Sequence, residues 1–206
     1  MSQREHIIAQ AAKMFAEQGI KAIRMDDIAQ SLGVSKRTLY ELFADKEELL
    51  YLCVSHLHQA NIAEFERQCS QYDDKIEAMF VGIRVMLDSD ERHSRMMRNL
   101  QKFYPAVFER VRSEQTRDGL ARLHKMILSL IEAGLIERDV NVELSVTIFY
   151  YTVTGVFFQR DNIVLPDGVT QKDAFMYTIV NFFRGIATVE GVSRIDALKA
   201  KYELEV

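Results

Sequence analysis

Two cations and two hydroxyl groups lie close together near the N-terminus: Lys36, Arg37, Thr38 and Tyr40. Proteins contact phosphate oxygens with such side chains, and the fork of an arginine also binds the edge of a guanine. At about 100° per residue of a helix, Arg37 points away from Leu39, and the other three polar groups lie on either side of it. The alternative interpretation is that these residues only form the solvent-exposed face of a helix. The neighbouring sequence distinguishes this from a nucleic-acid-binding surface.

The residues before this group predict two short helices joined by a tight turn. Ile28, Ala29 and Leu32 recur at helical spacing and stop at Gly33, which tolerates a left-handed backbone. Ser35 stands at the N-cap position of the second helix, where its hydroxyl accepts a backbone N–H. The apolar edge of that second helix consists of Leu39, Leu42 and Phe43. Two short helices with a glycine turn form the unit that places its second helix in the major groove of DNA.

This stretch resembles the N-terminal signature of the tetracycline-repressor (TetR) family of bacterial transcription regulators. The matching elements are Asp27-Ile28-Ala29, Gly33-Val34-Ser35, Thr38-Leu39-Tyr40, Phe43 and Lys46-Glu47. The first helix of the family and its end are matched upstream by Ile7, Ile8, Ala11, Ala12, Phe15 and Gly19. This many matching elements in the order of the family identify it more specifically than one short motif would.

Two positions depart from the family pattern. Members commonly carry Thr or Ser just before the second helix, where this chain has Arg24. We therefore expect Asp26 to cap that helix and Arg24 to contact phosphate. Many members have Gly or Ala at the position of Arg37, so a long cation there should change which base steps are read. The predicted DNA-binding residues are Arg24, Ser35, Lys36, Arg37, Thr38, Tyr40 and Lys46, the last at the start of a long helix whose N–H groups face a phosphate.

The bulk composition fits a largely helical, cytoplasmic protein. The chain has 206 residues, 48% of them hydrophobic, with two prolines, two cysteines and a net charge of −4. So few cysteines argue for a reducing compartment, and we expect neither a signal peptide nor a membrane-spanning segment. Residues 1–46 carry seven Lys/Arg against six Asp/Glu. The expected DNA binding therefore depends on where the cations project, and the acidic remainder should limit non-specific binding.

The rest of the chain is expected to form further helices, with caps at Asp45 and Asn141 and Pro105 in a first turn. Residues 144–158 and 174–189 are apolar nearly all round, and such helices must be buried on every side. A four-helix bundle with a second copy solves this, and it is also the dimer interface that the resemblance implies; burial within one subunit is the alternative. The expected interface residues are Phe149, Val153, Val156, Phe157, Tyr177, Val180, Phe183 and Arg184.

Methionines and aromatic residues recur between residues 76 and 160, and such side chains make adaptable apolar walls. They are equally what a helical core is made of. The resemblance implies an effector held in the C-terminal domain, and the composition suggests an apolar or amphipathic organic molecule. The expected pocket residues are Met79, Phe80, Ile83, Met86, Phe103, Tyr104, Phe108, Met126 and Phe149.

No catalytic set and no cofactor motif emerges from the sequence. Cys53, His56 and His58 invite a metal interpretation, but on a helix His58 is rotated about 200° from His56, so the three cannot converge. We therefore predict an all-α homodimer with a DNA-binding domain at residues 1–46 and an effector-binding and dimerisation domain at 47–206. Operator DNA and a small molecule are the expected partners, and repression the expected outcome. A regulator controlled by a protein partner, and a helical carrier or enzyme, are the rival interpretations.

Overall fold

A computed structural model describes residues 2–87, 91–158 and 164–202, with side chains for these except 83–87, 91–94, 156–158 and 171. The described residues form helices and no strand, which confirms the all-α prediction. The helices are α1 (Gln3–Gln18), α2 (Met25–Ser31), α3 (Lys36–Leu42), α4 (Lys46–Cys69), α5 (Lys75–Leu87), α6 (Glu91–Phe103), α7 (Pro105–Glu132), α8 (Val142–Phe158), α9 (Gln171–Ile186) and α10 (Val189–Lys201).

Several helix starts follow the sequence directly. Asp45 accepts the N–H of Glu48 at 2.8 Å, and Asn141 accepts the N–H of Leu144 at 3.1 Å, so both predicted caps are confirmed. Pro105 occupies the first turn of α7, as predicted. The two caps and the proline mark the starts of α4, α8 and α7, three helices that the hydrophobic pattern alone leaves without sharp boundaries.

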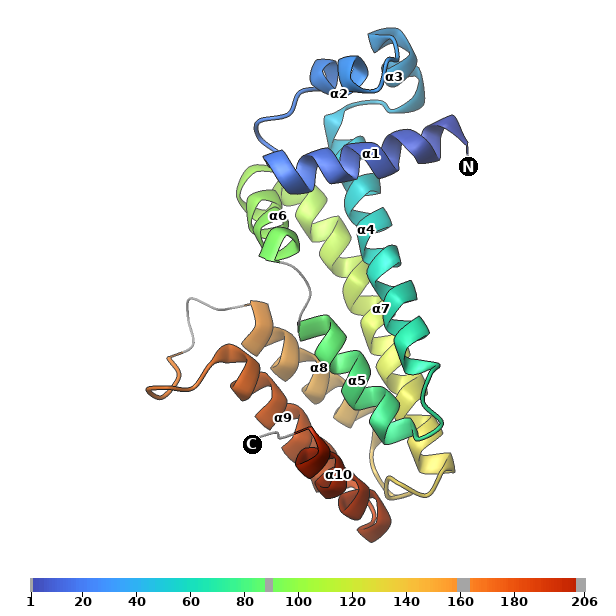
Figure 1. The fold of residues 1–206 in the computed structure, drawn as a ribbon, viewed down its shortest axis with the longest axis vertical. Helices are drawn as coiled ribbons and strands as arrows, with labels where there is room; N and C mark the ends of the chain where they lie inside the picture. The colour runs from blue at the N-terminus through green and yellow to red at the C-terminus, as the bar shows by residue number, and fades with distance from the viewer. Residues whose placement is uncertain (1, 88–90, 159–163, 203–206) are drawn as a thin grey trace. The chain divides into compact units, whose positions relative to one another are not determined.

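The chain divides into two compact units, the first of which holds residues 1–68 and 84–115. Its core is one cluster of buried apolar side chains from α1, α2, α3, α4, α6 and the first part of α7. Phe15, Leu39, Phe43 and Leu100 lie fully inside it. In this unit α2 and α3 lie on one side of α1, and α6 lies on the other side in contact with α1 (Figure 1).

The second unit holds residues 69–83 and 116–206, and α8 and α9 pack against each other within it. Phe149 lies with its ring centroid 4.5 Å from that of Phe182 and 5.2 Å from that of Phe183. The start of α10 is attached to the loop after α7, because Thr188 donates its N–H to the carbonyl of Leu135 and its hydroxyl to the carbonyl of Gly134. These contacts hold the C-terminal helix to the core of the unit.

Candidate nucleic-acid interface

The turn between α2 and α3 has the geometry that the sequence predicted. Gly33 has φ +64°, a left-handed conformation that residues with a Cβ rarely adopt. The N–H of Val34 reaches back to the carbonyl of Ala29 at 3.0 Å and closes the turn. Ser35 then caps α3, accepting the N–H of Thr38 at 3.0 Å. The turn and the cap together fix the direction in which α3 leaves α2.

The cap of α2 differs from the prediction. The carboxylate of Asp27, not Asp26, accepts the backbone N–H of Arg24 at 2.8 Å. This is the reciprocal half of a capping box, in which an acidic residue at the third helical position reaches back to the N-cap residue. Asp26 is instead paired with Lys36 across the turn. The expected cap at Asp26 was therefore wrong, because the side chain at the third helical position is the one that reaches the N-cap N–H.

The outward face of α3 carries Arg37, whose side chain is 88% exposed. Its Nε donates a hydrogen bond to Oε1 of Glu41, one turn further on, at 2.8 Å. Tyr40 is 52% exposed, whereas Leu39 and Phe43 are buried. The helix therefore presents an arginine fork and a phenol to solvent, while its apolar edge fixes it to the core of the first unit.

The remaining predicted contacts on α3 already have intramolecular partners. Lys36 pairs with Asp26, and the hydroxyls of Ser35 and Thr38 lie 2.8 Å apart. Both ion pairs on this helix are exposed, so each contributes about 0–1 kcal/mol to stability and opens readily. Arg24 is exposed at the start of α2. The charges on this surface are therefore available to phosphates after a small rearrangement.

Lys46 lies at the start of α4, as predicted, but its ammonium points inward. The Nζ atom donates a hydrogen bond to the carbonyl oxygen of Ile20 at 2.6 Å. It also lies 5.5 Å from the ring centroid of Tyr104 and 5.9 Å from that of Phe15. An ammonium has three donors, so this hydrogen bond leaves two for other acceptors. No pattern in the sequence indicates the bond to Ile20, which lies far away along the chain.

The expected dimer residues fall into three groups. Phe149, Val180 and Phe183 are buried within one subunit, and Arg184 is paired with Asp196. Tyr177 is 58% exposed and Val153 is half-buried, whereas the side chains of Val156 and Phe157 lie outside the described residues. The outward apolar stripe on α8 consists of other residues, each more than half exposed: Leu144, Ile148 and Tyr151. The helical repeat of 3.6 residues explains the difference. Leu144, Ile148 and Tyr151 lie on one face of α8, whereas Phe149, which packs against the rings of α9, lies on another.

The expected pocket residues are divided between the two units. Met79, Phe80, Met126 and Phe149 belong to the second unit, whereas Phe103, Tyr104 and Phe108 belong to the first. Tyr104 and Phe108 pack against the core of the first unit. The side chains of Ile83 and Met86 lie outside the described residues. The three aromatic residues from Phe103 to Phe108 are thus core and surface side chains of the unit that holds α3.

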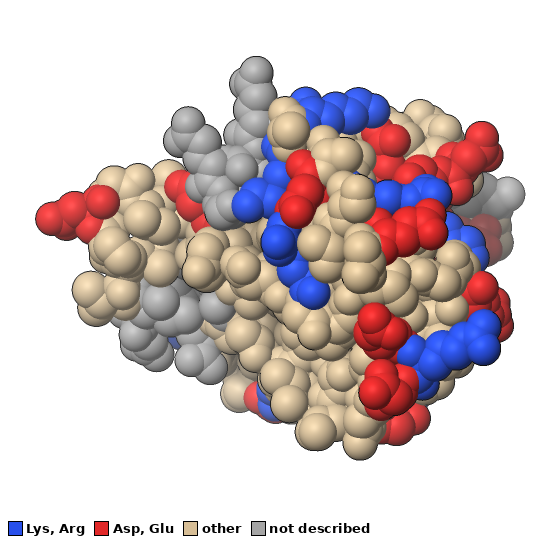
Figure 2. Space-filling model, turned by 90° about the horizontal axis from the view of Figure 1, so that it is seen from below, with Lys and Arg blue, Asp and Glu red and all other residues tan. Residues whose placement is uncertain are grey.

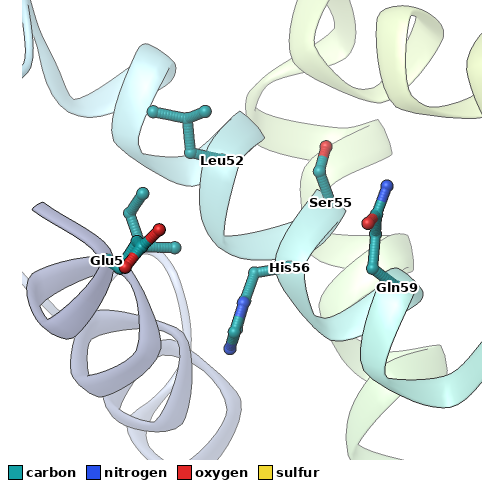
Figure 3. Close-up of a pocket in the computed structure, with 6 residues that line it drawn as sticks. Glu5, Leu52, Ser55, His56 and Gln59 are labelled. Atoms are coloured by element: carbon teal, nitrogen blue, oxygen red, sulfur yellow. The ribbon is translucent and has the colours of Figure 1, made fainter. Parts of the chain in front are cut away.

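An open hollow of about 380 Å³ lies between α1 and α4 in the first unit, lined by Glu5, Ile8, Leu52, Ser55, His56 and Gln59 (Figure 3). None of these residues was singled out as a pocket residue by the sequence. Glu5 is already used at the start of α1, where it accepts the N–H of Ser2, and this bond lowers the pKa of its carboxyl.

Cys53 is fully buried, and burial raises the pKa of its thiol. Its sulfur contacts the carbonyl of Ile8, so it acts as a core side chain. Within the described ranges, no three His, Cys, Asp or Glu residues lie close enough together to hold a metal ion. The same ranges contain no helix with the length and apolar content to cross a bilayer.

Comparison with known proteins places this geometry among bacterial regulators. Residues 7–51 match the family model described as "Bacterial regulatory proteins, tetR family". An HTH-type transcriptional regulator of Staphylococcus aureus is 30% identical over 111 residues, which cover 51% of this chain and 60% of the relative. The match therefore covers less than two thirds of the length of that curated relative.

Solved structures share the fold across most of the chain. A transcriptional regulator from Cytophaga hutchinsonii superposes with a TM-score of 0.75 at 18% identity, covering 89% of this chain and 98% of that one. The structure of SmeT, the repressor of the Stenotrophomonas maltophilia multidrug efflux pump SmeDEF, gives a TM-score of 0.65 at 20% identity, with 92% of each chain covered. The fold and the turn define a helix-turn-helix protein, whose N-terminal part at residues 7–51 matches the DNA-binding domain of the TetR family of bacterial transcription regulators.

Proposed function

We propose that this protein binds operator DNA through α2 and α3 and represses transcription in the cytoplasm. The observation that carries this proposal is the exposed fork of Arg37 on a helix fixed by the left-handed Gly33 and the Ser35 cap. An arginine held in this way reaches a guanine edge in the major groove, while Tyr40, Lys36 and Arg24 lie beside it as phosphate contacts. Residues 1–46 act as the DNA-binding part and residues 47–206 as the regulatory part.

The proposal includes a homodimer. The exposed stripe of Leu144, Ile148 and Tyr151 on α8 is an apolar surface of the kind that protein interfaces cover, and Tyr177 adds an exposed phenol on the adjacent α9. A two-fold dimer brings the same stripe from both copies together. It also supplies two recognition helices, which matches operators built from two half-sites.

An apolar or amphipathic small molecule is the proposed effector, held in the second unit by residues such as Met79, Phe80 and Met126. Binding there changes the separation of the two recognition helices and releases the operator. A regulator controlled by a protein partner keeps the same DNA-binding part and is the rival. A thermal-shift screen separates the two, because a ligand that binds only the folded state raises its melting temperature. Failure of lipophilic compounds to stabilise the protein and release DNA favours the protein partner.

The test of DNA binding is a titration of duplexes selected from a random-sequence library, followed by every single-base variant of the selected site. Arg37→Ala should cost about 1–3 kcal/mol per contact and relax the preference at one base step. Lys36→Ala should weaken all variants alike, because a phosphate contact carries no sequence information. If Arg37→Ala instead lowers the affinity equally for every base variant of the site, Arg37 contacts the DNA backbone and not a base. Selection that enriches no sequence overturns the proposed function.

A further inference from the structure

A row of exposed cations runs along α6 on the face opposite its buried side. Arg95, Arg98 and Lys102 are exposed and lie within about 60° of one another around the helix axis. The other face buries Met96, Met97 and Leu100 against the core of the first unit. This division makes α6 a strongly amphipathic helix whose polar side is basic.

Lys21 extends this row beyond α6. Its ammonium lies 4.8 Å from the ring centroid of Phe103, and the ammonium of Lys102 lies 5.3 Å from the same centroid. Each ammonium gains a cation–π contact with this partly exposed ring. The ring thus brings two like charges, one from the turn after α1 and one from α6, to the same place.

The four cations of this row differ from the cations on α3 because they are not paired with carboxylates in the part of the chain that the structure describes. Lys36 and Arg37 are each paired with a carboxylate. Among the residues whose side chains are described, no carboxylate forms an ion pair with Lys21, Arg95, Arg98 or Lys102. On the face seen from below in Figure 2, by contrast, basic side chains lie beside acidic ones. Like charges held near each other in this way favour binding of an anion.

The row connects with the DNA-binding helices through the turn after α1. Lys46 donates to the carbonyl of Ile20, the residue before Lys21, and Arg24 follows three residues later as the N-cap residue of α2. Lys21, just past the end of α1, and Arg24, at the start of α2, are therefore only three positions apart in the chain. Figure 1 shows this end of α1 directly beside α6.

We propose that Lys21, Arg95, Arg98 and Lys102, here called the α6 basic track, bind the sugar–phosphate backbone of duplex DNA. The inference rests on the proposed function, which brings DNA to the first unit, and adds a contact that carries no sequence information. The seven helical steps from Arg95 to Lys102 span about 10 Å along the helix axis. That length matches about three successive phosphates of one DNA strand along the duplex axis.

The experiment measures binding of a random-sequence duplex by fluorescence anisotropy over a range of salt concentrations. The variant is Arg95→Gln/Arg98→Gln/Lys102→Gln, since glutamine is a good helix former and keeps α6 polar on this face. A matched control, Arg122→Gln/Lys125→Gln/Arg138→Gln, removes the same charge from the second unit. Circular dichroism and thermal melts establish that both variants are folded.

We expect the α6 variant to bind the random duplex more weakly, with a salt slope lower by about 0.9 for each phosphate that it no longer neutralises. The control should keep the slope of the parent protein. An unchanged slope in the α6 variant, or an equal loss in the control, overturns the α6 basic track while leaving operator recognition standing. Absence of sequence preference in the parent protein instead overturns the proposed function, and absence of any duplex binding overturns both.

Discussion

Arg37 and Glu41 form an exposed ion pair, with Nε to Oε1 at 2.8 Å, on the side of α3 that faces away from the core. A carboxylate on a surface expected to meet phosphates repels DNA, yet it also accepts a hydrogen bond from the guanidinium of the arginine. Because the side chains are 88% and 59% exposed, the pair itself contributes only about 0.3–0.5 kcal/mol to the stability of the helix. We therefore expect its main effect to be on DNA binding, where the carboxylate should oppose loose contact with any duplex.

Glu41→Gln should strengthen binding to DNA, and more so for random duplexes than for the selected operator. The variant removes one negative charge per subunit from the interface, an effect of at most about 1 kcal/mol for an exposed charge. The ratio of operator affinity to random-duplex affinity should then fall. Anisotropy titrations of both duplexes at one salt concentration measure this ratio. Glu132→Gln, an exposed change in the second unit, is the control, and an equal gain there would show that net charge alone explains the result.

Lys46→Met should lower stability as well as DNA affinity. Methionine keeps the length of the side chain but leaves the carbonyl of the buried Ile20 without its donor, a loss of about 1–2 kcal/mol. The other two donors of the lysine can bind a phosphate, so the salt slope should also fall by about 0.9 for each phosphate that the variant no longer neutralises. Urea unfolding and salt titrations measure the two effects separately. Lys13→Met, on the exposed side of α1, should change neither, and an unaltered urea midpoint for Lys46→Met would contradict the structural role.

Ile148→Lys should convert the dimer to a monomer and weaken operator binding, because it places a charge in the middle of the apolar stripe on α8. The residue is 53% exposed in one subunit, so the substitution should leave the fold intact. Sedimentation velocity measures the assembly, and circular dichroism checks the fold. Leu128→Lys is the control, since that leucine is also exposed but lies on α7. A folded Ile148→Lys variant that sediments as the parent protein does would exclude this stripe as the interface.

The sequence predicted most of what local rules determine. The left-handed Gly33, the Ser35 cap, and the caps at Asp45 and Asn141 all depend on residues within a few positions of one another. Each has a physical cause that can be read from neighbouring residues. The error at Asp26 is of the same local kind, since the neighbouring Asp27 bonds to the N-cap N–H and Asp26 pairs with Lys36.

Contacts between segments that are far apart in the chain could not be predicted from the sequence. The bond from Lys46 to Ile20 and the meeting of Lys21 with Lys102 at Phe103 both depend on how α1, α4 and α6 pack. The sequence showed that residues 144–158 are apolar, but it did not show which face of this helix is exposed. A helix that is apolar all round has no polar side that marks its exposed face. Packing of Phe149 on α9 decides that face.

Gly191→Ala should destabilise the second unit, because α10 begins against the backbone of the loop after α7. A Cβ at this position would lie 2.1 Å from the carbonyl oxygen of Leu135 and 3.0 Å from Cβ of Ala187. That carbonyl already accepts the N–H of Thr188 at 3.1 Å, so it cannot move aside without breaking the attachment of α10. We expect a loss of about 1–3 kcal/mol, typical of overpacking, together with faster amide hydrogen exchange in α10. Ser193→Ala, exposed on the same helix, should stay within about 0.5 kcal/mol of the parent. If Gly191→Ala unfolds at the parent's urea midpoint with α10 equally protected, the close approach of α10 to Leu135 is not a constraint on this fold.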